Sequence, residues 1–206
     1  MTVVLFAGSP RARSNTRSIS ADLRIRLEAA GATVVTLDPK RGEEATPVFI
    51  ARSIEALREA DALVIASPVY LDLPPFKALS WLHALLEEHE RLAEYGPNVY
   101  AITHSGYFEP VHKAVSLRAY EHFCDRVHWP WRGGLAFGGT SPIDGRTLGE
   151  AGPFSRRVRP ALDALADVIA GGKLVPRKLS ARAGRSPIPL PRTLVVWLMN
   201  RMLKRQ

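Results

Sequence analysis

Hydroxyl, amide and guanidinium side chains are concentrated in residues 8–16, which read GSPRARSNT. The segment follows an unbroken apolar run, residues 3–6, and precedes apolar residues at helical spacing, Ile19, Leu23 and Leu27. A loop that leads from a strand into a helix presents free backbone N–H groups and the positive end of the helix dipole. These groups favour an anion, above all a phosphate, although an ordinary turn with a polar helix cap would have a similar sequence.

Two later segments combine small, polar and aromatic residues. Residues 67–71 read SPVYL and residues 103–107 read THSGY, each at the end of a predicted buried strand. In the first, Tyr70 offers a flat ring either to a ligand or to the core. In the second, Gly106 permits close approach of a backbone to a ligand, and His104 is either a group that stabilises negative charge or a structural histidine.

The elements that must position these loops alternate between strands and helices. Apolar runs predict strands at residues 3–6, 32–37, 62–66, 99–103 and 135–137. Helical spacing predicts a helix after Thr16 and others at residues 50–60, 76–89, 112–127 and 154–169. Such alternation requires an α/β fold, and five strands fit the flavodoxin-like, doubly wound parallel sheet of order 2-1-3-4-5. In that fold a ligand lies beyond the carboxyl ends of the strands, where these loops are.

The loops resemble signatures of the NADPH-dependent FMN reductases, a flavodoxin-like family. Residues 8–16 are similar to its phosphate loop, GSxRxxSxN, and residues 67–77 to its second signature, S/T-PxYxxxxPxxLK. Residues 103–107 resemble its small-residue turn at the polar edge of the flavin. Trp81 departs from the family, which often has an Asp there. The resemblance implies that FMN is bound by Ser9, Arg11, Ser14, Asn15, Thr16, Ser67, Pro68, Val69, Tyr70, Leu71, Thr103, His104, Ser105, Gly106 and Tyr107.

By this resemblance we expect an FMN-dependent NAD(P)H oxidoreductase that forms a homodimer. In the family, hydride passes from NADPH or NADH through flavin N5 to a quinone, azo, nitroaromatic or flavin acceptor. Two alternatives of the same fold stay open, a flavodoxin-like one-electron carrier and a flavin-free binding or scaffold protein. The carrier is disfavoured because flavodoxins generally have strongly acidic surfaces, whereas this chain has a near-neutral body and a basic tail.

Charge and cysteine content exclude several classes of protein. The 206-residue chain carries a formal charge of +8, but no acidic residue follows Asp167, so the basicity belongs to the C-terminal segment. A nucleic-acid-binding domain would carry a basic face on its folded body, and we expect no nucleic-acid partner. The single cysteine, Cys124, excludes internal disulfides and cysteine-ligated zinc or iron–sulfur centres, and no metal site is expected. The sequence shows no signal peptide and no membrane span, so we expect a cytoplasmic protein.

The composition changes after Gly172, where the predicted FMN-binding domain, residues 1–172, ends. Residues 173–192 are rich in Pro, Arg and Ser and are predicted to form an extended arm without a core of its own. An amphipathic helix that starts at Pro191 then completes the second segment, residues 173–206. This helix would pack on its own domain or on a second subunit, or would contact a membrane surface peripherally.

Overall fold

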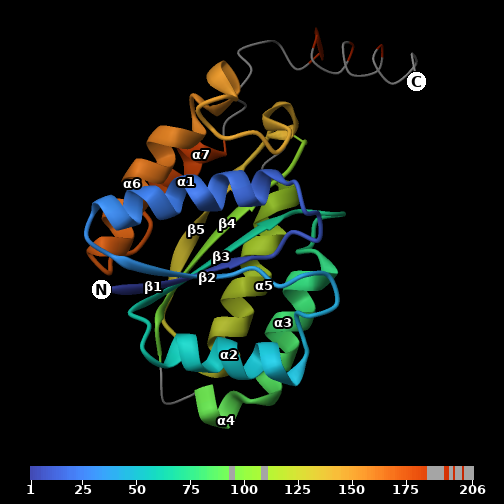
Figure 1. Ribbon diagram of the computed structural model, residues 1–206. Coiled ribbons are helices and arrows are strands. Elements are labelled where there is room, and N and C mark those ends of the chain that lie inside the picture. The colour runs from blue at the N-terminus through green and yellow to red at the C-terminus, as the bar shows by residue number, and fades with distance from the viewer. Residues whose placement is uncertain (93–95, 108–110, 185–192, 195–196, 198–200, 202–206) are drawn as a thin grey trace.

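The computed structural model describes residues 1–92, 96–107, 111–184, 193–194, 197 and 201. In this part of the chain, parallel strands form one five-stranded sheet in the order β2-β1-β3-β4-β5 (Figure 1). The predicted flavodoxin-like topology is therefore confirmed. The strands are β1 (Thr2–Ala7), β2 (Thr33–Leu37), β3 (Ala62–Pro68), β4 (Asn98–His104) and β5 (Trp131–Phe137).

Helices cover both faces of this sheet (Figure 1). One face packs against α1 (Asn15–Ala29), α6 (Val158–Ala170) and α7 (Arg177–Ala183). The other face packs against α2 (Pro47–Arg58), α3 (Phe76–Glu87) and α5 (Val111–Val127), with the short α4 (His89–Leu92) beside them. Two 3-10 turns, η1 (Ser141–Ile143) and η2 (Gly152–Ser155), connect β5 to α6.

The side chains of β1 show why its sequence is continuously apolar. Val3 and Leu5 belong to the core on the α1 side, whereas Val4 and Phe6 belong to the core on the α3 side. Successive side chains of a strand point to opposite faces, so a strand that is covered on both faces has no solvent-exposed position. Phe6 stacks on Trp81 of α3 with 3.8 Å between the ring centroids, so Trp81 serves the core here.

The fifth strand is longer than the predicted residues 135–137, because it also contains Gly133 and Gly134. A Cβ atom at Gly134 would lie 2.6 Å from the carbonyl oxygen of Ala101, so only glycine lets β5 approach β4 this closely. The last large helix begins at Val158 rather than at Phe154, since the residues before it form η2.

The predicted extended arm is wrong for its first part. Residues 177–183 form α7, and three apolar residues at four-residue spacing, Val175, Leu179 and Ala183, pack against the core. The amide of Val175 donates to the Arg132 carbonyl at 2.8 Å, which fixes the segment to β5. Composition alone predicts an arm without a core, because three apolar residues hardly change the composition of a segment rich in Pro, Arg and Ser.

Residues 185–192, and most of the predicted C-terminal helix, lie outside the described residues. The packing of that helix, its contact with a membrane surface and the division of the chain at residue 172 therefore stay predictions. Among the helices that the structure describes, none has the length and apolar character to cross a membrane.

Candidate functional site

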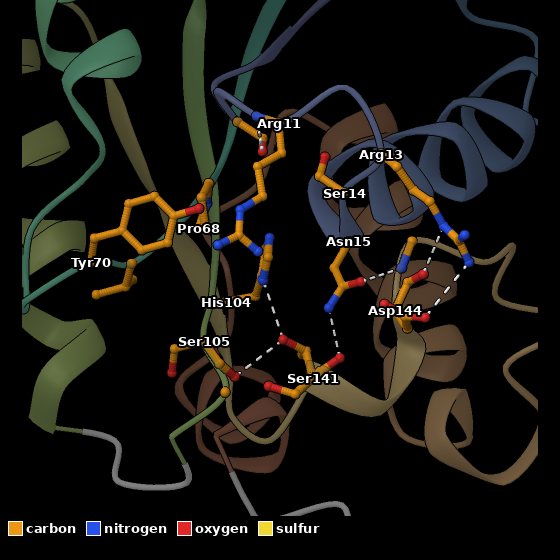
Figure 2. Close-up of a pocket in the computed structure, with 15 residues that line it drawn as sticks. Arg11, Arg13, Ser14, Asn15, Pro68, Tyr70, His104, Ser105, Ser141 and Asp144 are labelled. Atoms are coloured by element: carbon orange, nitrogen blue, oxygen red, sulfur yellow. Dashed lines mark hydrogen bonds and ion pairs between the residues drawn. The ribbon is translucent and has the colours of Figure 1, made fainter. Parts of the chain in front are cut away.

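A cavity of about 340 Å³ opens at the edge of the sheet where β1, β3, β4 and β5 end (Figure 2). The sequence predicts that three strand-end loops converge there, and Ser14, Tyr70 and Gly106 do line this one cavity. Its volume falls in the range of small-molecule sites. The wall consists of Ser9, Arg11, Arg13, Ser14 and Asn15, then Pro68, Val69 and Tyr70, then His104, Ser105 and Gly106, and finally Thr140, Ser141, Asp144 and Gly145.

Five residues of the predicted site lie behind the wall or beside it. Thr16, Ser67 and Thr103 are buried in the fold, so they support the wall without forming its surface. Leu71 and Tyr107 are exposed at its margin, where Leu71 is 97% and Tyr107 64% accessible. The direct contact of these five residues with a cofactor stays a prediction.

One wall of the cavity, the loop after β5, lies outside the set of predicted site residues. This loop contributes Thr140, Ser141, Asp144 and Gly145. Its sequence, GGTSPIDG, is rich in small residues, but the same composition is typical of any connection between a strand and a helix. The rule that places ligands at the carboxyl ends of parallel strands could have found it, because β5 is the neighbour of β4.

Asn15 joins the first loop to the loop after β5. Its Nδ2 donates to the Thr140 carbonyl at 2.7 Å, and its Oδ1 accepts from the Gly145 amide at 2.7 Å. Gly145 has a φ of +63°, and a Cβ atom there would lie 2.5 Å from Cγ of Arg13. The two loops can therefore meet only because residue 145 is a glycine.

His104 ties three loops together beneath the cavity. Its Nε2 lies 2.7 Å from Oγ1 of Thr16, and its Nδ1 lies 3.2 Å from Oγ1 of Thr140. The Thr140 hydroxyl donates to the Ser105 carbonyl at 3.1 Å, so it accepts from Nδ1–H, and Nε2 accepts from the Thr16 hydroxyl.

The surroundings of His104 favour one of its two predicted roles, that of a structural histidine. Burial lowers the pKa of His104 to about 4, so the ring is neutral near pH 7. In the chain without a ligand, the ring positions the loops as a structural histidine, and a role in stabilising reduced flavin stays a prediction.

The loop after β1 combines a helix start with backbone amides, unpaired among the described residues, beside the cavity. Ser14 is the N-cap of α1, and its Oγ accepts from the Arg17 amide at 3.3 Å. Within the described part of the chain, the backbone amides of residues 12–16 have no hydrogen-bond acceptor. Figure 2 shows the Arg11 side chain extending into the space between the loops. Free amides at a helix start and a guanidinium group make this end of the cavity electropositive.

Tyr70 forms the other end of the cavity, at the base of a tight turn. Its amide donates to the Leu73 carbonyl at 2.9 Å, and the Leu73 amide donates back at 3.1 Å. Between them, Leu71 and Asp72 have φ values of +48° and +69°, a left-handed conformation that is rare for leucine. Tyr70 is 41% exposed, so its ring lies at the surface of the site and not in the core.

A second cavity, of about 500 Å³, adjoins the first and shares Arg11 and Tyr70 with it. The rest of its wall is formed by Pro10, Arg41, Gly42, Glu44, Pro75, Phe76 and Lys77. The two cavities together provide room for more than one ligand at the same edge of the sheet.

The first cavity fits FMN in its chemistry. Free amides, hydroxyls and Arg11 at one end suit a dianionic phosphate, and backbone and an exposed aromatic ring at the other end suit a flat heterocycle. Among the residues described, no cluster of three or more His, Cys, Asp or Glu could hold a metal ion.

Comparison with known proteins gives one family and many similar folds. Residues 1–75 match the model of the NADPH-dependent FMN reductase family. No curated protein sequence matches the chain. Among solved structures, the apo form of an NADH:FMN oxidoreductase has 14% sequence identity and a TM-score of 0.63, with 93% of this chain and 98% of that chain covered.

Two further structures have the same architecture. An NAD(P)H:quinone oxidoreductase from Methanothermobacter marburgensis has 19% identity and a TM-score of 0.59, with 80% of this chain and 94% of that chain covered. An FMN-dependent NADH-azoreductase from Bacillus anthracis, solved in complex with FMN, has 11% identity and a TM-score of 0.55, with 82% and 100% covered. At these identities, the structural similarity shows the flavodoxin-like fold.

The family match agrees with the predicted resemblance and extends over the two loops that form opposite ends of the cavity. Residues 1–75 contain both the phosphate loop and the loop of Tyr70. Over these residues the chain is thus similar to the NADPH-dependent FMN reductases, flavodoxin-like enzymes with FMN as cofactor and NAD(P)H as co-substrate.

Proposed function

We propose that this chain is an NAD(P)H oxidoreductase that uses FMN to reduce a small-molecule acceptor, namely a quinone, an azo compound, a nitroaromatic or a free flavin. One observation carries the proposal: a single cavity has an electropositive loop at one end and an exposed aromatic ring at the other (Figure 2). This arrangement favours a ligand with both a phosphate and a flat ring.

The residues of the chain bind and orient the cofactor in this proposal. Ser9, Ser14 and the free amides of residues 12–16 would bind the phosphate, while Val69, Tyr70 and Gly106 would line the ring. When bound, FMN supplies the redox chemistry by accepting a hydride and passing electrons on. The backbone beside the ring is fixed, because the Val69 amide donates to the His104 carbonyl at 2.8 Å. The protein needs no acid–base pair of its own for this chemistry.

The second cavity is the proposed site of the nicotinamide co-substrate. Arg41 and Lys77 are the basic residues that this wall adds; Lys77 is paired with Asp38, whereas among the described residues no carboxylate pairs with Arg41. Its guanidinium would bind a phosphate of NAD(P)H, and the exposed rings of Tyr70 and Phe76 would contact the bases. The acceptor would enter through the same opening after the nicotinamide has left.

We also propose that the chain forms a homodimer near this opening. Leu73 is 47% exposed at the margin of this opening, an apolar side chain that a second copy would cover, while Tyr70, Leu71 and Phe76 stay open to the co-substrate. A molar mass measured by light scattering on the purified protein tests this, and a monomeric mass at micromolar concentration would contradict it. The cytoplasmic location stays a prediction.

Absorbance spectroscopy tests the proposed function. Protein reconstituted with FMN is expected to show a bound-flavin spectrum that bleaches on addition of NADPH or NADH and returns when a quinone is added. Steady-state rates at several quinone concentrations should give parallel double-reciprocal lines, because donor and acceptor use one opening in turn. Protein that binds no FMN would refute the proposal, and intersecting lines would refute the shared opening.

A further inference from the structure

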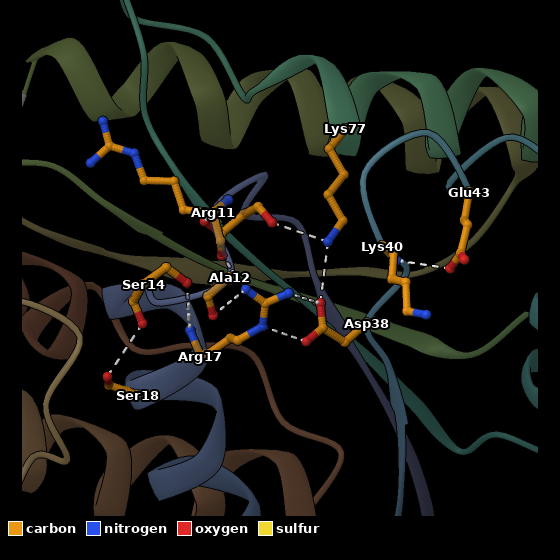
Figure 3. A network of polar contacts seen from close by, with 10 residues as sticks. Arg11, Ala12, Ser14, Arg17, Ser18, Asp38, Lys40, Glu43 and Lys77 are labelled. Carbon is orange, nitrogen blue, oxygen red and sulfur yellow. Dashed lines mark hydrogen bonds and ion pairs between the residues drawn. The ribbon is translucent and has the colours of Figure 1, made fainter.

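We propose that Arg17, Asp38 and Lys77 form a positioning network that makes the site selective for phosphorylated over unphosphorylated flavin. They bind three carbonyl groups of the phosphate loop and thereby hold these oxygens away from the ligand (Figure 3). The carbonyls that Arg17 binds belong to peptide groups whose N–H groups, those of Ala12 and Arg13, have no acceptor among the described residues and stay free for the ligand. None of the three lines the first cavity, so they act through the loop and not on the ligand. The inference rests on the proposed function, since it presupposes that FMN is the ligand.

Arg17, in the first turn of α1, reaches back to the loop that precedes its own helix. Its Nη1 donates to the carbonyl of Ala12 at 2.6 Å and also to the carbonyl of Arg11. Its Nε and Nη2 donate to the two carboxylate oxygens of Asp38 at 2.5 and 2.8 Å. This bidentate pairing fixes the plane of the guanidinium group, and with it the direction of the two loop carbonyls.

Lys77, at the start of α3, binds the same loop from the other side of Asp38. Its Nζ donates to the Ser9 carbonyl at 3.0 Å and to Oδ1 of Asp38 at 3.2 Å. Lys77 is only 3% exposed, and a buried ammonium group is costly unless it is paired and hydrogen-bonded. The partners that offset this cost are one carboxylate and one carbonyl of the phosphate loop.

Asp38 connects the two cations of the network. It follows β2, so β2 contributes to the site although no residue of this strand lines the first cavity. Burial lowers the pKa of Lys77, and the Asp38 carboxylate opposes this shift. The buried carboxylate of Glu44 also acts on Lys77, so the network holds the loop by direct contacts and not by a net positive charge.

The orientation of the loop follows from these contacts. With the carbonyls of Ser9, Arg11 and Ala12 held by cations, the peptide groups of the loop cannot turn these oxygens toward an anion. The amides of residues 12–16 meanwhile have no acceptor in the described part of the chain. The loop is thus preorganised for a phosphate before the ligand binds.

Flavin affinities separate a positioning role from a merely structural one. We would measure the dissociation constants of FMN and riboflavin by quenching of flavin fluorescence, for the wild type, Lys77→Met and Arg17→Gln. Methionine keeps the unbranched, buried stem of Lys77 but has no donor. We expect both variants to bind FMN about 10-fold more weakly and riboflavin within about 2-fold of the wild type, so that the FMN preference falls about 10-fold.

Arg24→Gln is the matched control. It removes the exposed Arg24–Glu28 ion pair on the same helix, with no contact to the loop, and should change neither affinity. An unchanged ratio of the two affinities in Lys77→Met and Arg17→Gln would overturn the inference while the proposed function stands. If Lys77→Met does not fold, the affinities of Arg17→Gln alone test the inference. The Arg17 side chain is 31% exposed, so its replacement should leave the fold intact. A wild type that binds no FMN would instead refute the proposed function itself.

Discussion

The two ends of the first cavity are built in opposite ways. At the phosphate end, Asn15 binds the loop after β5 at two atoms, and Arg17 and Lys77 hold the loop carbonyls from behind. At the ring end, Tyr70 lies on a turn that is closed by two backbone hydrogen bonds to Leu73 and has exposed apolar side chains.

This difference fits the two tasks that the site has in the proposed function. The phosphate of a resident cofactor is bound permanently, so a loop that is fixed in advance lowers the entropy lost on binding. The ring end must admit and release a nicotinamide and an acceptor at every turnover, so an accessible surface is required. Perturbations of the phosphate end should therefore change cofactor affinity, and perturbations of the ring end should change kinetics.

The largest effect on the phosphate end is expected from Gly145→Val. The new side chain would collide with Arg13 and would need a φ of +63°, which valine strongly disfavours. We expect FMN affinity to fall by at least about 10-fold, measured by fluorescence quenching. Gly152→Val is the control, because Gly152 has a similar φ of +53° but nothing within 4 Å. Equal losses in both variants would show that backbone strain, and not contact with the phosphate loop, is responsible.

The second largest effect is expected for the pH dependence of the unfolding free energy, because His104 holds the phosphate end to the loops after β4 and β5. The pKa of His104 falls from 6.5 to about 4 on folding, so the unfolded chain binds the proton first as the pH falls. The contribution of His104 is therefore complete above about pH 6.5 and is lost progressively toward pH 4, by about 3 kcal/mol in total.

Urea denaturation between pH 7.5 and pH 4.5 checks this prediction. We expect the unfolding free energy of His104→Gln to depend less on pH than that of the wild type, because glutamine does not titrate. His83→Gln, at an exposed position that pairs with Glu87 on α3, should keep the wild-type dependence. If the unfolding free energy of His104→Gln depended on pH as strongly as that of the wild type, protonation of this ring would not be coupled to folding.

The parts of the fold that depend on local pattern could be predicted from the sequence. The run Val3–Phe6 indicates a strand buried on both faces, and the spacing of Ile19, Leu23 and Leu27 indicates the buried side of α1. The order of the strands follows from the alternation of elements and the handedness of their connections. The same rule brings Ser14, Tyr70 and Gly106 to one edge of the sheet.

The contacts that complete the site could not be predicted in this way. Asn15 pairs with residues 125 and 130 positions away, and Lys77 pairs with Asp38 from a different element. A sequence pattern reports the environment of a residue along its own element, and it does not report which polar groups of two loops meet. His104 shows the same limit, because its burial follows from the loops that close over it after β5.

At the ring end, Tyr70→Ala tests the division of tasks. Removal of the exposed ring should raise KM for NAD(P)H or the acceptor several-fold, while the FMN dissociation constant stays within about 5-fold, because stacking contributes about 1 kcal/mol. Tyr70→Phe is the control, since it keeps the ring and should keep KM. A loss of FMN affinity comparable to that of Gly145→Val would mean that the ring end also holds the cofactor firmly.

The smallest effect is expected from Leu71→Asn in the turn beside Tyr70. Leu71 is 97% exposed with a φ of +48°, so the substitution removes almost no packing and introduces a residue that tolerates this conformation better. We expect the unfolding free energy to rise by about 0.5 kcal/mol, measured by thermal denaturation, with an unchanged FMN affinity. Leu73→Asn, outside the left-handed pair, should not stabilise the protein. If Leu71→Asn lowered FMN affinity instead, the conformation of this turn would matter for cofactor binding, and the contrast between a fixed phosphate end and an open ring end would not hold.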